Sequence, residues 1–227
     1  MKRAAFLLVL ALAVPVAAQS PAPAPKIELP YSQFTLPNGL RVILHEDHSV
    51  PMVTVNMWYH VGSARELTKR TGFAHLFEHL MFMGSGHVKP GEFDEWLEAA
   101  GGDNNGSTEN DRTNYWINVP ATSLELALFL ESDRMGYLLD TMTPKTVDAQ
   151  RDVVKNERRQ SVENQPYGTA QVVLGEMLYP EGHPYHWPVI GCGTPPGLTS
   201  PNHFSISFRA AALSRSPATT RLAFLGA

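Results

Sequence analysis

Apolar and polar positions alternate along several early segments of the chain, as they do in half-buried β-strands. Residues 34–44 contain two such runs on either side of a Pro-Asn-Gly turn signal at 37–39, so they predict a hairpin. Residues 51–61 are rich in Val, Met, Trp and Tyr and predict a long central strand. Residues 103–108 and 113–119 predict a second pair of strands.

Helical periodicity takes over at residues 72–83, where apolar side chains recur along one helix face. Further helices are predicted at 91–100, in a long segment opened by Pro120, from 145 to about 164, and at 168–179. Strands and helices follow each other without a regular strand-helix-strand rhythm. The pattern therefore predicts an α+β fold in which a largely antiparallel sheet packs against helices.

The first 30 residues follow a different pattern. Residues 1–18 combine two basic residues, a short apolar run and small residues before Ala18, which predicts a secretory signal peptide. The run is shorter than the roughly 20 residues that span a bilayer, so we expect no stable membrane anchor. We expect an exported protein, periplasmic or secreted. Residues 19–30 are rich in Pro and Ala and predict an extended linker.

The folded domain is predicted to cover residues 31–191. Residues 192–227 are rich in Pro, Gly and Ser and have poor periodicity until a strand-like run near the end. We expect this segment to be atypical, as the product of a truncation or of a frameshift after Gly191.

Composition narrows the class of protein. The 227 residues are 43% hydrophobic and 18% charged, which is typical of a globular chain. The net charge is −4 and the Lys and Arg residues are scattered, so nucleic acid is not an expected partner. Cys192 is the single cysteine, which excludes an intramolecular disulfide.

The sequence His-Leu-Phe-Glu-His at 75–79 carries the candidate chemistry. On a helix, His75, Glu78 and His79 share one face. Two imidazoles one turn apart can bind one Zn²⁺, which makes a water acidic enough for a nearby carboxylate to deprotonate. A catalytic zinc usually has three protein ligands. Glu157, on a different predicted helix, is a candidate for the third, but a Glu on a charged helix is usually only solvated.

Four blocks of the sequence together resemble a known family. They are residues 36–42, residues 72–85, the paired segments at 105–108 and 111–115, and residues 153–159. In this order and spacing, residues 31–191 resemble the pitrilysin/insulinase family of metallopeptidases, whose inverted zinc motif is His-x-x-Glu-His. The resemblance implies the pitrilysin/mitochondrial-processing-peptidase-like fold.

The resemblance also implies roles for individual residues. His75 and His79 match the family's two histidine ligands, Glu157 matches its distal glutamate ligand, and Glu78 matches its catalytic base. An edge strand along which an extended peptide substrate lies is matched by Asn105, Gly106, Ser107 and Thr108. Binding through strand addition uses backbone groups and tolerates many side chains.

The resulting interpretation is a zinc-dependent metalloendopeptidase domain that hydrolyses peptides or unfolded segments. The family carries at least a second, similar domain, so we expect the chain to have weak or no activity without a second half or partner subunit. One alternative is a non-catalytic partner or scaffold subunit, although such subunits usually lack the metal ligands. Another is a zinc-binding protein without catalysis, which the presence of Glu78 argues against.

Overall fold

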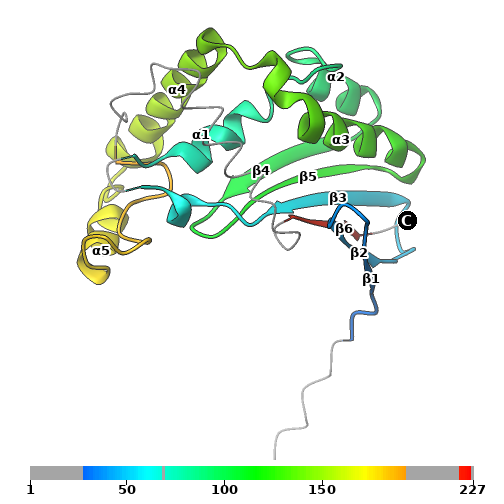
Figure 1. Cartoon of the computed structure of the whole chain (residues 1–227), viewed down its shortest axis with the longest axis horizontal. Helices are drawn as coiled ribbons and strands as arrows, with labels where there is room; N and C mark the ends of the chain where they lie inside the picture. The colour runs from blue at the N-terminus through cyan, green and yellow to red at the C-terminus, as the bar shows by residue number, and fades with distance from the viewer. Residues whose placement is uncertain (1–27, 68–69, 193–219, 226–227) are drawn as a thin grey trace, which may run out of the picture.

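The computed structural model describes residues 28–67, 70–192 and 220–225. A six-stranded sheet in the order β1-β2-β6-β3-β5-β4 forms its base, and helices lie over one face (Figure 1). The strands are β1 (Ser32–Thr35), β2 (Arg41–His45), β3 (Met52–Tyr59), β4 (Asp103–Thr108), β5 (Thr113–Pro120) and β6 (Thr220–Leu225). The helices are α1 (Phe73–Leu80), α2 (Glu92–Ala99), α3 (Leu124–Thr141), α4 (Pro144–Arg158) and α5 (Ala170–Leu178).

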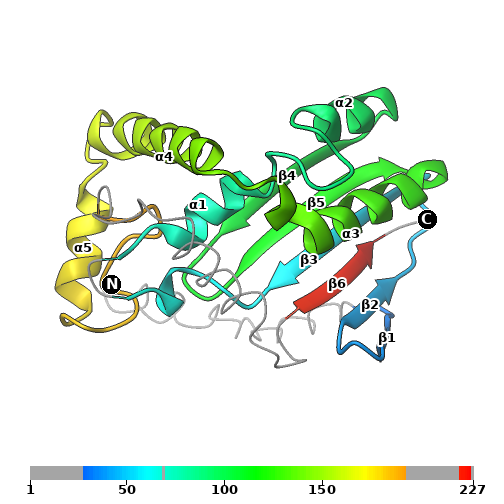
Figure 2. The same cartoon turned by 45° about the horizontal axis from the view of Figure 1, so that its top comes forward.

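Neighbouring strands run antiparallel, except that β6 runs parallel to β2. The predicted hairpin is confirmed as β1 and β2, and the predicted pair at 103–119 is confirmed as β4 and β5. Figure 2 shows β6 between β2 and β3, so a strand from residues 220–225 lies between two strands from residues 41–59. The α+β prediction with a largely antiparallel sheet is therefore correct.

The main core lies between the sheet and the helices above it. In β3, Val53, Val55 and Met57 are buried and alternate with less buried polar residues, as a strand with one covered face requires. Helix α3 contacts β3 and β5, while α2 and α1 contact β4. A smaller core joins α1 to α4 through Leu76, Leu80, Val147 and Val154.

Several predicted helix boundaries differ from the structure, two of them by four residues or more. Pro120 does not open α3: it is the last residue of β5 and pairs with Met52, and a short 3₁₀ turn follows before α3 begins at Leu124. The helix predicted up to about residue 164 is α-helical only to Arg158 and continues as a π-helical turn over Arg159–Glu163. Apolar periodicity does not distinguish these turns from an α-helix.

The predicted signal peptide and most of the predicted linker lie outside the described residues, as does most of the segment after residue 192. Among the helices that the structure describes, none combines the length and the apolar character needed to cross a membrane.

Candidate metal centre

Helix α1 carries the motif, and a carboxylate fixes where the helix begins. Gly72 precedes it in a left-handed conformation (φ 91°), and Glu66 accepts hydrogen bonds from the backbone N–H groups of Gly72 (2.8 Å) and Ala74 (2.7 Å). These groups have no acceptor inside the helix, so Glu66 supplies one. Burial raises the pKa of the Glu66 carboxyl to about 7, although the backbone N–H groups oppose this shift.

The structure brings His75, His79 and Glu157 together from two helices. The Nε2 atom of His75 lies 3.6 Å from one Glu157 carboxylate oxygen, and the Nε2 atom of His79 lies 3.1 Å from the other. One ligand atom from each of the three residues lies within 4.8 Å of the other two. The buried side chains Leu76 and Leu80 of α1 pack against Val147 and Val154 of α4, which holds the two helices together beside these polar groups.

This donor set fits a zinc ion in both chemistry and spacing. Tetrahedral bonds of 2.0–2.2 Å separate neighbouring ligand atoms by about 3.3–3.6 Å, close to the observed contacts of Glu157 with the two rings. Burial lowers the pKa of His75, against the attraction of Glu157, and so favours the neutral imidazole that binds metals. Neutral rings and a carboxylate at these distances need a proton or a cation between them.

Glu78 lies on the same helix and is oriented by the edge strand β4. The Thr108 hydroxyl donates a hydrogen bond to a Glu78 carboxylate oxygen at 2.5 Å. Gly106 allows the close approach of the strand, because a Cβ atom there would lie 3.2 Å from Glu78 Cγ and 3.3 Å from its Oε1. The carboxylate is therefore held between α1 and β4.

The four residues of the predicted substrate strand divide between the two faces of β4. Gly106 and Thr108 face Glu78. Ser107 donates its hydroxyl hydrogen to Asn114 and accepts one from Arg112, so its side chain belongs to the polar network of β5. The exposed Asn105 side chain bonds to the backbone N–H of Gly106. Because β4 ends the sheet order, its outer edge is not paired with another strand of the described part of the chain.

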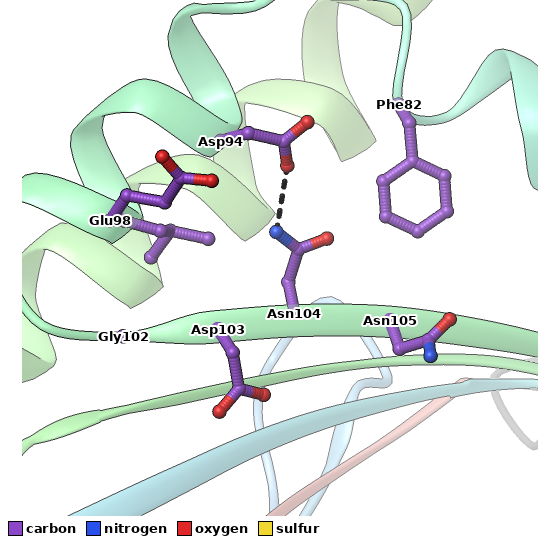
Figure 3. A pocket seen from close by; sticks show the side chains of 8 residues that line it. Phe82, Asp94, Glu98, Gly102, Asp103, Asn104 and Asn105 are labelled. Atoms are coloured by element: carbon purple, nitrogen blue, oxygen red, sulfur yellow. Dashed lines mark hydrogen bonds between the residues drawn. The ribbon is translucent and has the colours of Figure 1, made fainter.

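A hollow of about 530 Å³ lies beside this open edge, between β4 and α2. Figure 3 shows Asn104 bonded to Asp94 across it, at 2.8 Å, with Phe82 at one end. Its lining is both apolar and acidic and consists of Phe82, Asp94, Leu97, Glu98, Gly102, Asp103, Asn104 and Asn105. The edge strand thus has a recess next to it that can receive a side chain.

Sequence reasoning missed three features of the site. Glu66 gave no signal, because its partners are backbone groups six and eight positions away. The Thr108–Glu78 hydrogen bond joins residues 30 positions apart, which no helix or strand period predicts. The role of Phe82 in the hollow depends on the placement of α2, although its apolar position after the motif was visible.

Comparisons with known proteins show the family to which the chain belongs. The family model described as Insulinase (Peptidase family M16) matches residues 41–181. The chain is 35% identical over 162 residues to the zinc protease PqqE of Helicobacter pylori, covering 71% of this chain and 36% of that protein. It is 32% identical over 143 residues to a probable mitochondrial-processing peptidase subunit beta of Arabidopsis thaliana, covering 63% and 26%.

A solved structure described as a protease from Helicobacter pylori superposes on 87% of this chain and 46% of its own, with a TM-score of 0.75 and 30% identity. The chain belongs to the insulinase family of peptidases. It spans about a quarter to a third of the length of the curated relatives named above.

Proposed function

We propose that this chain is the zinc-binding, catalytic part of a metalloendopeptidase. The observation that carries the proposal is the convergence of His75, His79 and Glu157 at metal-ligand spacing, next to a carboxylate held by an open edge strand. Similarity to a protein named a zinc protease supports zinc as the metal. In this proposal the three residues are the ligands and Glu78 is the general base.

The side chains divide the chemistry between them. Zinc, when bound, supplies Lewis-acid chemistry, which polarises a peptide carbonyl and makes a water acidic near neutral pH. Glu78 takes a proton from the attacking water and passes it to the leaving amine. The Thr108 hydroxyl donates a hydrogen bond to the Glu78 carboxylate and so limits its movement during this transfer. No other carboxylate is needed for this proton transfer.

The edge strand indicates the form of the substrate. An extended peptide can add to β4 as a further strand, using the backbone groups of Asn105, Gly106, Ser107 and Thr108. Its side chains would alternate, so that one of them enters the hollow beside α2. This mode suits peptides and unfolded segments, because a folded protein rarely offers a free extended backbone.

Helix α5 supports the need for a second half or partner subunit. Its side chains Val173, Leu174, Met177 and Leu178 are 48–80% exposed, an unusual surface for an isolated soluble domain. The relatives are much longer than this chain. We propose that residues 31–191, together with β6, form one peptidase domain, and that the chain alone cleaves peptides slowly.

We propose that residues 1–18 direct export and are removed, followed by a linker over residues 19–30. The protein would then act in the periplasm or outside the cell. The N-terminal sequence of the mature protein from a cell-envelope fraction tests this directly: a start after Ala18 supports it, and an intact Met1 in the cytoplasm contradicts it.

The catalytic proposal is tested with the zinc-loaded chain and a short unstructured fluorogenic peptide. We expect slow cleavage that a chelator abolishes and that Glu78→Gln reduces about 100-fold or more, with zinc retained. Glu125→Gln, an exposed residue on α3, is the matched control and should cleave normally. Chelator-resistant cleavage, or cleavage that survives Glu78→Gln, contradicts the mechanism. Bound zinc with no cleavage at any concentration favours the non-catalytic subunit.

A further inference from the structure

The three proposed ligands stand on two helices, so their spacing depends on what joins α1 to α4. One link is the small apolar core, in which Val154 is the buried α4 residue nearest to Glu157 in sequence. Beyond Val154, the last turn of α4 carries Glu157 itself. A second link, made by the next residue, lies at this end of the helix.

Arg158 provides that link through two directed hydrogen bonds. Its Nε atom donates to the Glu163 carboxylate at 3.0 Å, and its Nη1 atom donates to the backbone carbonyl of Gly191. Glu163 reaches Arg158 because α4 widens into a π-helical turn after Arg158, which brings a residue five positions on over its start. The side chain is only 18% exposed. Glu163 thus fixes the guanidinium through Nε, and Nη1 binds the carbonyl of Gly191.

Gly191 belongs to a turn that lies directly on the start of α1. Its N–H bonds to the Pro188 carbonyl at 2.9 Å, and its φ of 87° favours glycine. A Cβ atom at Gly191 would lie 2.8 Å from the Thr71 carbonyl oxygen and 2.9 Å from Gly72 Cα. The two backbones therefore touch without intervening side chains.

Two further hydrogen bonds fix this turn. The N–H of Cys192 donates to the Thr71 hydroxyl at 3.1 Å, and the indole N–H of Trp187 donates to the Ser63 carbonyl at 2.9 Å. A continuous set of contacts thus runs from Arg158 on α4, through the turn at 188–192, to Thr71 and Gly72 at the start of α1.

We propose that Arg158 is a positioning residue for the metal site, which holds Glu157 at its distance from His75 and His79 by tying α4 to this turn. It does not touch the metal or the substrate. The proposal rests on the proposed zinc function, and it assigns to the turn at 188–192 the task of setting the helix spacing.

The test is the zinc affinity of the full chain, measured by competition with a chromophoric chelator. Arg158→Met keeps the aliphatic stem and removes the donors, and we expect it to weaken zinc binding about tenfold or more, as the loss of residues that orient ligands does. Arg159→Met is the matched control. Arg159 is exposed, and its Nη1 atom donates a hydrogen bond to Asn156 at 2.8 Å. We therefore expect the zinc affinity of Arg159→Met to stay within about twofold of that of the unsubstituted chain.

A second variant separates positioning from a general loss of stability. Gly191→Ala disturbs the same link from the turn, so it should weaken zinc binding similarly. The zinc affinity of the double variant, Arg158→Met with Gly191→Ala, should then match that of Gly191→Ala alone within about twofold. Circular dichroism with chelator present establishes that each variant is folded. Zinc affinity of Arg158→Met equal to that of Arg159→Met overturns the proposal. So does a double variant whose loss of zinc-binding free energy equals the sum of the losses in Arg158→Met and Gly191→Ala. If the unsubstituted chain binds no zinc, the proposed function itself fails.

Discussion

At the scale of single residues, the site depends on how closely β4 approaches α1. The Thr108 hydroxyl contacts the Glu78 carboxylate directly, and Gly106 leaves no side chain between strand and helix. A larger residue at position 106 has Glu78 on one side and the Tyr115 ring on the other. The position is therefore sensitive to a single methyl group.

Gly106→Ala is expected to destabilise the protein by about 1–3 kcal/mol, because the new Cβ lies 3.2 Å from both Glu78 Cγ and Tyr115 Cδ1. Urea denaturation measures the change in free energy of unfolding. Gly136→Ala is the control: it lies within α3 with nothing within 4 Å of its Cβ, so it should stabilise by about 0.5–1 kcal/mol. A Gly106→Ala variant as stable as the unsubstituted protein contradicts this account of the packing.

At the scale of elements, Glu66 links the segment before α1 to the start of that helix. Its raised pKa means that the folded protein holds a proton on Glu66 more tightly than the unfolded chain does. The stability that this bound proton contributes is therefore fully present when the pH is below 4.5, the ordinary pKa of the group. It is lost as the pH rises through about 7, the pKa in the folded protein. The loss is at most about 3 kcal/mol.

Glu66→Gln removes this titration and keeps an acceptor for the helix N-terminus. We expect the difference in unfolding free energy between the original and the variant to change between pH 5 and pH 7.5, with the original losing more stability on the alkaline side. Denaturant titrations in the presence of a chelator measure it without a contribution from metal binding. A pH-independent difference contradicts the raised pKa.

Most elements could be predicted because local periodicity determines them. The hairpin at β1 and β2 has a turn signal between alternating runs, and α1 has a regular apolar face, so sequence alone located both. The π-helical turn after Arg158 and the Glu66 cap could not be found this way. They depend on backbone groups and on contacts across the fold, which leave no period in the sequence. The three metal-binding roles stay predictions, although the structure brings their donors together.

At the scale of the whole molecule, the sheet is completed by a segment that the sequence pattern marks as atypical. Strand β6 pairs with β3 on one side and β2 on the other, so it is an interior strand. The strand-like character of the last residues was visible, but its place in the sheet was not. Pairing between strands 161 to 180 positions apart is a tertiary property.

Ala223→Pro tests this placement through the backbone alone. Proline removes an N–H from a strand that is paired on both sides, so we expect a loss of about 1–3 kcal/mol in unfolding free energy. Ser32→Pro is the control, because it alters the first residue of the edge strand β1, where proline is tolerated. Equal effects of the two substitutions contradict an interior β6.

The central claim is that His75, His79 and Glu157 hold one metal ion. Elemental analysis of the purified full chain after dialysis against zinc and then zinc-free buffer tests it most directly. We predict about one zinc per chain, retained in Glu78→Gln and lost in His79→Ala and Glu157→Gln. A zinc content that is negligible in the unsubstituted chain, or that persists in His79→Ala, contradicts the claim.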